Sequence, residues 1–356
     1  MSARRAGLLS ALLATAALLC AMPGLWRGAM RADSNRMDER LRPPRTRTLT
    51  VWLLPGGVDD RKLLNEACAA FEKEAGDVRV FLRTVDAQEL MAADAVLPDV
   101  ALMACGSLTE PERALLPLSV DGEMDASGRS GGVWYAMPLW LAPNVLSLPA
   151  EWLRAQPAPQ ADSLLGAPAP PEEEDGGGEL EAAALPWRRL LGEKGLALPK
   201  GVALQQLMFA CPVSIRGELA ALAHTDATEG QARVCTLSQH LARKQAGEAV
   251  EAYALMPCVS DCVRYIALCR DGRDARAFAA FLAGEAVQAR TTAYGLLPAQ
   301  GEAEACDALT NTLLARYRES MTLPNAFAHT AQEREAICRD AFLRAADPVE
   351  TLLRLR

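Results

Sequence analysis

The chain has 356 residues, of which 50% are hydrophobic, and this length is enough to bury one large core or two cores of ordinary size. The formal net charge is −8 and no long basic run occurs, so the chain lacks the electrostatic attraction that supplies most non-specific affinity for nucleic acid. We therefore expect two lobes and no nucleic-acid partner.

The N-terminal segment is predicted to lie outside the fold. Arg4 and Arg5 precede an apolar run from Ala6 to Met22, which is the pattern of an export signal. Because this run is close to the shortest helix that spans a membrane, residues 1–30 are expected to be a cleaved signal peptide or an uncleaved N-terminal anchor. Lipidation of Cys20 is a third possibility, although this cysteine can equally be one more apolar residue of the run. The chain is expected at the cell envelope, on the outer face of the cytoplasmic membrane or in the periplasm.

A flexible tether and then a strand, a helix and a second strand are predicted next. Residues 31–47 are charged and proline-bearing with no apolar period. A short strand is expected at 48–54, and the PGGVDD turn after it supplies Asp59 or Asp60 as a helix N-cap. Helical spacing of apolar residues follows from 61 to 75, then a strand at 78–85, which together make a βαβ unit.

A further strand is predicted at residues 99–104, with a short helix over 111–118. The first strand-to-helix turn is PGG and not G-x-G-x-x-G, so a dinucleotide site has no support. Small ligands still tend to bind at the carboxyl ends of strands in open α/β sheets. The sequence places Trp52, Pro55 and Gly56 at such an end.

Three aromatic residues gather in the segment GGVWYAMPLW, residues 131–140. If the stretch is one strand, alternation puts Tyr135 on one face. The opposite face then has Trp134, Ala136, Pro138 and Trp140.

The motif GRSGG, residues 128–132, matches G-x-S-x-G but lies in the wrong context for a catalytic serine. A nucleophile elbow needs a buried strand before the serine and a helix after it. A polar, turn-like stretch precedes Ser130 and a strand-like stretch follows it. A serine hydrolase is therefore not expected, and we assign no catalytic residue.

The second half of the chain begins with an unusual insertion. Residues 155–184 are rich in Pro, Gly, Ala and acidic residues, which predicts a flexible surface insertion. Strands are predicted at 252–257 and 263–269, around a CVSD turn. Helices are predicted over three further segments, 275–291, 303–320 and 331–346.

Cysteine usage argues against a disulfide framework. The chain has ten cysteines, and the nine that remain without Cys20 are an odd number, mostly single in apolar contexts typical of small buried side chains. Cys258, Cys262 and Cys269 are the exception, for which a disulfide or a metal pair is conceivable. Because no C-x-x-C and no paired histidine accompanies them, we expect neither a metal nor a cofactor.

In this order the segments resemble the family 1 extracellular solute-binding proteins, the ligand-capturing components of ABC importers for sugars and related solutes. The likeness rests on TLTVWLLPGG, LLNEACAAFEKEAGDVRVFLRTV, LPDVALMACGSL, GGVWYAMPLWLAPNVLSL and AFAAFLAGEAVQARTTAYGLLPA. The chain departs from the family at Leu148 and Pro149, where a tyrosine–asparagine pair is usual. It also has CVSDC where a glycine- and tryptophan-rich ligand loop is expected.

The resemblance implies an α/β fold of the type II periplasmic-binding-protein kind, with two lobes of mixed sheets flanked by helices and a hinge between them. Residues 48–138 would begin lobe 1, residues 139–270 would form lobe 2 with the insertion, and residues 271–356 would return to lobe 1 as helices. The implied function is that of a monomer that captures a small solute, most simply a carbohydrate, and delivers it to ABC permease subunits without chemistry. The alternative is an envelope sensor or interaction protein that keeps the fold but transports nothing.

Four residues are candidates for ligand contact. Trp140 lies near a position where family members often present an aromatic ring to the cleft, and its face suits a pyranose; the alternative is core packing. Asn144 offers a donor and an acceptor to a hydroxylated ligand, or it is a turn residue. Trp52 ends the first strand, where a cleft residue is expected. Asp261 could accept hydroxyl hydrogen bonds, or it is a solvated turn carboxylate.

Overall fold

The computed structural model describes most of the chain from residue 46 onward. The described residues are 46–92, 96–119, 126–151, 196–197, 232–254, 262–299, 303–304, 307, 309–311, 313–315, 323, 325–344, 346 and 348–355. The predictions made for Cys20, Cys258, Asp261, the tether 31–45 and the insertion 155–184 lie outside them. The chain divides into two compact units, Met1–Thr48 with Asp77–Arg79, and Leu49–Gly76 with Val80–Arg356. In the first unit Arg47 pairs with Asp77 at 2.8 Å.

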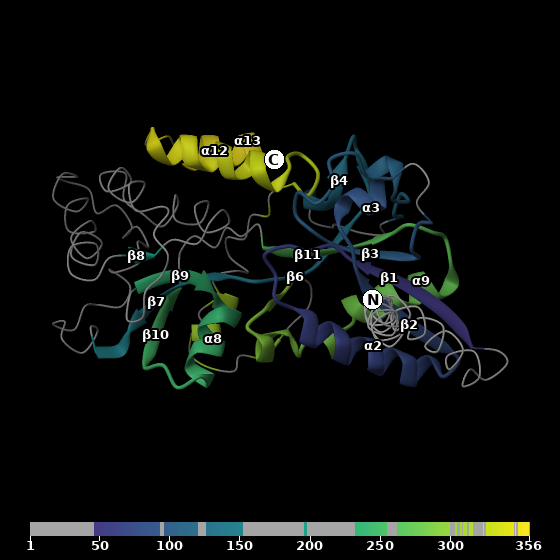
Figure 1. The fold of residues 1–356 in the computed structure, drawn as a ribbon, viewed down its shortest axis with the longest axis horizontal. Coiled ribbons are helices and arrows are strands. Elements are labelled where there is room, and N and C mark those ends of the chain that lie inside the picture. Colours follow the sequence, from purple (N-terminus) through teal and green to yellow (C-terminus); the bar gives the residue numbers. More distant parts are fainter. Residues whose placement is uncertain are drawn as a thin grey trace, which may run out of the picture. The chain divides into compact units, whose positions relative to one another are not determined.

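A six-stranded mixed sheet forms the first part of the fold (Figure 1). β1 and β3 pair in parallel, whereas β11 is antiparallel to both β3 and β6. The strand order is β12 (Leu297–Pro298), β6 (Met137–Leu141), β11 (Val263–Leu268), β3 (Val100–Ala104), β1 (Arg47–Leu53) and β2 (Val78–Thr84). The strands predicted at 48–54, 78–85, 99–104 and 263–269 are thereby confirmed.

One face of this sheet is covered by α2 (Arg61–Ala75) and α9 (Arg273–Ala283). α2 spans the predicted residues because its apolar positions recur at helical spacing and Gly76, with φ of 73°, ends it. Phe71 of α2 meets Phe278 of α9 edge to face, with ring centroids 5.1 Å apart. The predicted helix 275–291 is divided into α9, α10 (Glu285–Gln288) and the 3₁₀ turn η4 (Thr291–Tyr294).

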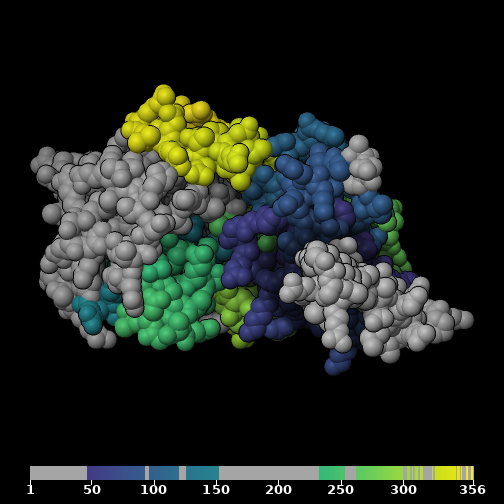
Figure 2. Space-filling view, in the orientation of Figure 1, coloured from purple at the N-terminus to yellow at the C-terminus, as the bar shows by residue number. Residues whose placement is uncertain are grey.

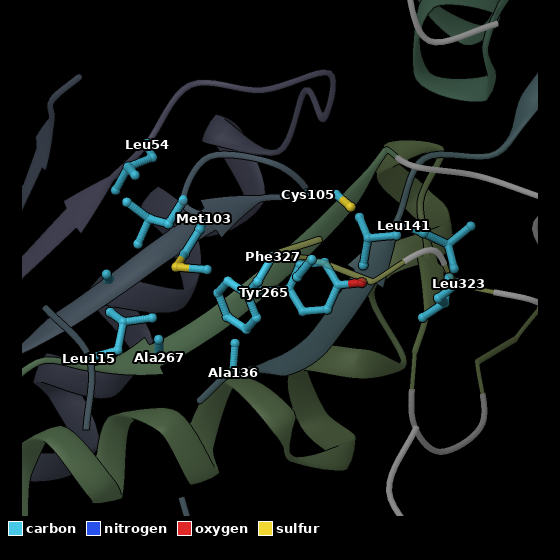
Figure 3. Packing of buried hydrophobic residues seen from close by; sticks show 14 of the residues in the cluster. Leu54, Met103, Cys105, Leu115, Ala136, Leu141, Tyr265, Ala267, Leu323 and Phe327 are labelled. Atoms are coloured by element: carbon cyan, nitrogen blue, oxygen red, sulfur yellow. The ribbon is translucent and has the colours of Figure 1, made fainter. Parts of the chain in front are cut away.

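The opposite face is covered by short elements and by the C-terminal part of the chain. Met103, Tyr265 and Phe327 lie together in this core (Figure 3). α3 (Ala87–Met91) and η1 (Pro111–Arg113) border it, and η1 is a single turn where a longer helix was predicted. α12 (Ala331–Leu343) and α13 (Pro348–Leu355) form a contiguous part of the surface, coloured yellow in Figure 2.

A separate four-stranded sheet has the order β10 (Val250–Ala254), β7 (Asn144–Pro149), β9 (Ala232–Thr236) and β8 (Leu196–Ala197). α8 (Leu237–Gln245) follows β9 and begins with a capping box between Thr236 and Gln239. The strands predicted around the CVSD turn do not pair with each other, because β10 joins β7 in this sheet whereas β11 belongs to the first.

Two short connections link the sheets. β6 of the first sheet leads through Ala142 and Pro143 into β7 of the second, and β10 precedes β11. The backbone N–H of Ala142 donates to the carbonyl of Cys262 at 2.8 Å, so the two connections lie side by side. Among the described strands, the chain therefore passes from the first sheet to the second and back, which is the arrangement that the resemblance implied.

The aromatic segment 131–140 is two strands and not one. β4 (Arg129–Ser130) and β5 (Val133–Trp134) form a hairpin, and Gly131 and Gly132 make its turn with φ of 56° and 87°. Within β6, Pro138 is opposite Tyr265 but Trp140 is opposite Arg264, so a bulge reverses the alternation. The prediction that Ala136, Pro138 and Trp140 share one face is therefore wrong, because the bulge turns Trp140 to the other face.

Two further sequence features are the cysteines and the apolar character of the helices. The six described cysteines are buried and form no disulfide, as predicted for small apolar side chains: Cys68, Cys105, Cys235, Cys262, Cys269 and Cys338. Cys262 and Cys269 thus form no disulfide with each other. In the parts of the chain described here, no helix combines the length and apolar character needed to cross a membrane.

Candidate functional site

A buried ion pair lies at the point where the first sheet meets α2. Asp60 stands immediately before α2, and Arg264 is on β11; both are 2% exposed. Arg264 Nε donates to Asp60 Oδ2 at 2.7 Å and Nη2 donates to Oδ1 at 3.0 Å, which is the bidentate arrangement of a strong pair. Trp140 Nε1 donates to the same Oδ2 at 2.8 Å. We call these three residues the Asp60 cluster.

Arg264 also holds the loop between β1 and α2. Its Nη1 donates to the carbonyl of Leu54 at 2.9 Å and its Nη2 lies 3.4 Å from the carbonyl of Val58. Asp60 occupies the predicted N-cap position, but its side chain makes no hydrogen bond to the helix backbone, because Arg264 and Trp140 engage it instead. The cluster therefore joins β6, β11 and the loop 54–60.

Trp140 has no exposed surface in this conformation. Its only polar atom is satisfied by Asp60. Both observations favour core packing, which was the alternative interpretation of Trp140 from the sequence. Ligand contact by this indole stays a prediction.

Asn144 is the first residue of β7 and is 2% exposed. Among the described residues, its Nδ2 has no hydrogen-bond partner. It pairs in register with Thr236, the N-cap of α8, and the first N–H of that helix donates to the carbonyl of Pro143 at 2.8 Å. Asn144 therefore places an unsatisfied amide donor beside the connection between the sheets, and such a donor is unfavourable unless a partner is supplied.

Trp52 lies on β1, partly buried, with the guanidinium of Arg83 5.7 Å from its ring centroid. It is opposite Ala101, which is opposite Ala267, whereas Trp140 is opposite Arg264. Because Arg264 and Ala267 are three residues apart on one strand, their side chains lie on opposite faces of the sheet. The structure therefore does not bring Trp52 and Trp140 together, and Asp261 lies outside the described residues.

A second buried polar cluster lies between β7 and α8. Ser147 Oγ is 2.9 Å from His240 Nδ1 and accepts from Arg243 Nη1 at 2.8 Å. Arg243 also pairs with Glu248, Nη2 to Oε2, at 2.7 Å. Burial, together with the positive charges of Lys244 and Arg243, lowers the pKa of His240 to about 4. Ser147 is 0% exposed, so this serine–histidine contact offers no accessible nucleophile.

Sequence reasoning missed both buried clusters. The signal for the first was an arginine inside the apolar run VRYIALC, because a lone charge on a buried strand must find a partner. Among the described residues, no group of three or more His, Cys, Asp or Glu side chains is placed to hold a metal ion.

Several solved structures are similar to this chain, and three of them are receptors studied with a bound ligand. The GacH receptor of Streptomyces glaucescens, studied unliganded and with acarbose and an acarbose homolog, gives a TM-score of 0.55 at 16% identity over 87% of this chain and 96% of that one. An ABC substrate-binding protein of Listeria monocytogenes in complex with cycloalternan gives 0.52 at 14% identity over 86% and 96%. The galacto-N-biose-/lacto-N-biose I-binding protein of Bifidobacterium longum, in complex with lacto-N-biose, gives 0.53 at 13% identity over 87% and 95%.

No model of a protein family matches the chain, and no curated protein matches it in sequence. The structural likeness covers nearly the whole of each receptor. The chain thus has the two-lobed α/β fold of the periplasmic binding proteins, and the predicted fold class is confirmed. At these identities the likeness establishes the fold, while function depends on the site.

Proposed function

We propose that the chain is the solute-binding protein of an ABC importer, which captures a carbohydrate where its two sheets meet and delivers it to a membrane permease. The observation that supports this most directly is the pair of adjacent connections at Ala142 and Cys262, in a fold shared with saccharide receptors. Two sheets joined in this way can close on a ligand by bending at the connections. The role needs no catalysed reaction and no cofactor, and we propose that the chain acts as an exported monomer.

Asn144 is the residue that we propose as the first ligand contact. Its Nδ2 is buried beside the connection and has no partner in the described part of the chain, so a hydroxyl oxygen of the solute would satisfy it on binding. We propose Trp52 as a partly exposed aromatic surface and Asp261 as an acceptor for hydroxyl hydrogens. Contact by Trp140 would require the Asp60 cluster to open.

The test is a panel of saccharides with purified full-length protein. Thermal unfolding and calorimetry are measured with acarbose, lacto-N-biose and cycloalternan, and with an amino-acid mixture as the control. A ligand present at a hundred times its Kd should stabilise the fold by about 2.7 kcal/mol. A correctly folded protein that no saccharide stabilises would contradict the proposal.

Two variants test the proposed contacts in the same assay. Asn144→Leu keeps a similar volume and removes the unsatisfied donor, so affinity should fall about tenfold with no loss of stability. Trp140→Ala should instead lower the free energy of unfolding by about 3–5 kcal/mol, since it empties a buried site. If Trp140→Ala weakens binding while the melting temperature stays within a few degrees, the ligand role predicted from the sequence is correct.

The second candidate function is that of an envelope sensor or interaction protein that has kept the fold without transport. The burial of Trp140 favours it, because the aromatic residue expected at the cleft has no exposed surface. Adjacent genes distinguish the two candidates: two permease genes support import, whereas a sensor kinase gene supports the second function.

A further inference from the structure

We propose that Arg264 and Trp140 are positioning residues, which fix the loop 54–60 at the carboxyl end of β1 and thereby set affinity for the solute without touching it. The exposed residues of the loop are Pro55, Gly56, Gly57 and Asp59. In open α/β sheets ligands bind beyond the carboxyl ends of the strands, and glycines there let a ligand approach the main chain. A held loop presents its peptide groups in one geometry before the solute arrives.

Arg264 contacts the loop 54–60 at three points along its length. One guanidinium group reaches the carbonyl of Leu54 at the start, the carbonyl of Val58 in the middle and the carboxylate of Asp60 at the end. Arginine can do this because its five N–H groups lie in one rigid plane. Trp140 adds a third donor to Asp60, so that carboxylate is held from two strands.

The loop is also closely packed against the end of β3. A Cβ added to Gly56 would lie 2.0 Å from the Cβ of Ala104, so the Gly56 backbone lies directly on that side chain. Leu54 N–H donates to the carbonyl of Leu102 at 2.8 Å. The carboxyl ends of β1 and β3 therefore meet at this loop, and Arg264 determines how it lies on them.

The same residues connect the loop to the links between the sheets. Trp140 is two residues before Ala142, and Arg264 is two residues after Cys262, and Ala142 and Cys262 are hydrogen-bonded. A shift of either link would displace a donor from Asp60 or from the loop carbonyls. The position of the loop is thus coupled to the position of the links.

Amide hydrogen exchange of ligand-free full-length protein tests the proposal. The double variant Asp60→Leu/Arg264→Met replaces the buried ion pair by apolar residues of similar volume, a change that often leaves stability unchanged. Exchange in the loop 54–60 should accelerate at least about tenfold while the rest of the sheet stays protected. Unchanged exchange in the loop of this folded variant would overturn the proposal.

Two further variants make the test independent of folding defects. Arg243→Met removes another buried arginine, in the second sheet, and should leave exchange of the loop 54–60 at the wild-type rate. Trp140→Phe removes only one donor to Asp60, and should accelerate exchange of the loop by about two- to fivefold. If Trp140→Phe does not change this exchange, or Arg243→Met accelerates it equally, the positioning role is wrong.

The link to affinity rests on the proposed function and is measured separately. With acarbose as the probe, the double variant should bind at least about tenfold more weakly than the wild type. Equal affinity of the two for acarbose would overturn the positioning role. Failure of the wild type to bind any saccharide in the panel would contradict the proposed function instead, and the exchange measurement would still decide whether the cluster holds the loop.

Discussion

At the residue scale, the cluster between β7 and α8 shows how a histidine is kept neutral. Ser147 accepts a hydrogen bond from Arg243, so its own hydroxyl proton is available for Nδ1 of His240. The pKa of His240 is lowered to about 4 chiefly by burial, and further by the positive charges of Lys244 and Arg243.

The free energy of unfolding should therefore decrease as the pH is lowered through a defined window. The pKa of His240 is about 4 in the folded chain and near its ordinary value of 6.5 in the unfolded chain, so the unfolded chain binds the extra proton between these values. The contribution of neutral His240 to the free energy of unfolding is fully present above pH 6.5. It is lost as the pH falls toward 4, and the total loss is about 3 kcal/mol. Urea unfolding at several pH values measures it.

His240→Gln is the control for this dependence, because glutamine can bond Ser147 but does not titrate. The variant should show a flatter pH profile between 4 and 6.5 than the wild type. Equal slopes would mean that other groups, such as carboxylates, account for the acid sensitivity.

Residue-scale features were the least predictable from the sequence. The partly buried Trp52 at the end of β1 followed from local pattern, whereas the place of Trp140 did not. One bulge in β6 reverses its face, and its partner Asp60 is 80 residues away. Alternation assumes a regular strand, and no local signal marks where a strand departs from regularity.

At the element scale, Gly295 makes a close backbone contact with α8 of the second sheet. Gly295 ends η4 in the left-handed conformation, with φ of 69°. A Cβ added there would lie 2.5 Å from the backbone N of Ser238 in the first turn of α8. An element next to the first sheet thus contacts a helix of the second sheet through backbone alone.

Two glycine substitutions separate conformational strain from this contact. Gly247 has φ of 88° and no atom within 4 Å of an added Cβ, so Gly247→Ala should destabilise the fold by about 1–2 kcal/mol through strain alone. Gly295→Ala should cost about 1–3 kcal/mol more, because it also overpacks the contact. The free energy of unfolding in urea measures both, and equal losses would show that the contact yields easily.

The positions of helices and strands were largely predictable, whereas the strands with which each strand pairs were not. α2 and β11 follow from the spacing of apolar residues, which is a local property. The assignment of β10 and β11 to different sheets is not local, because each strand pattern is compatible with several neighbours. The sequence predicted two strands around the CVSD turn but not which sheet each one joins, and β10 and β11 belong to different sheets.

At the scale of the whole molecule, Arg334 and the neighbouring residues Asn325 and Ala326 hold the C-terminal part of the chain against the first part of the fold. Arg334 of α12 donates to the carbonyl and to the thiol of Cys105, which follows β3 directly. The N–H of Gly106 donates to the carbonyl of Ala326 at 2.8 Å, and Asn325 Nδ2 donates to the carbonyl of Arg129 at 2.8 Å. Residues 325–334 thereby close the core shown in Figure 3.

Arg334→Met should lower the free energy of unfolding by about 2 kcal/mol, since hydrogen bonds to a charged donor are lost inside the core. The matched control is Arg344→Met, at the residue directly after the same helix, where the arginine is exposed and pairs only with the exposed Asp340 in the described contacts. That change should stay within about 0.5 kcal/mol. Equal losses of unfolding free energy in the two variants, measured with urea, would show that the hydrogen bonds of Arg334 contribute little to stability.

The buried cysteines have a consequence for the proposed export of the chain. Burial raises the pKa of Cys68 to about 12, of Cys235 to about 11 and of Cys269 to about 12. Thiol oxidation and exchange proceed through the thiolate, so these side chains are almost inert once folded. The time during which an oxidising compartment can form wrong disulfides is therefore limited to the interval before the sheets close, and the speed of folding is its main protection.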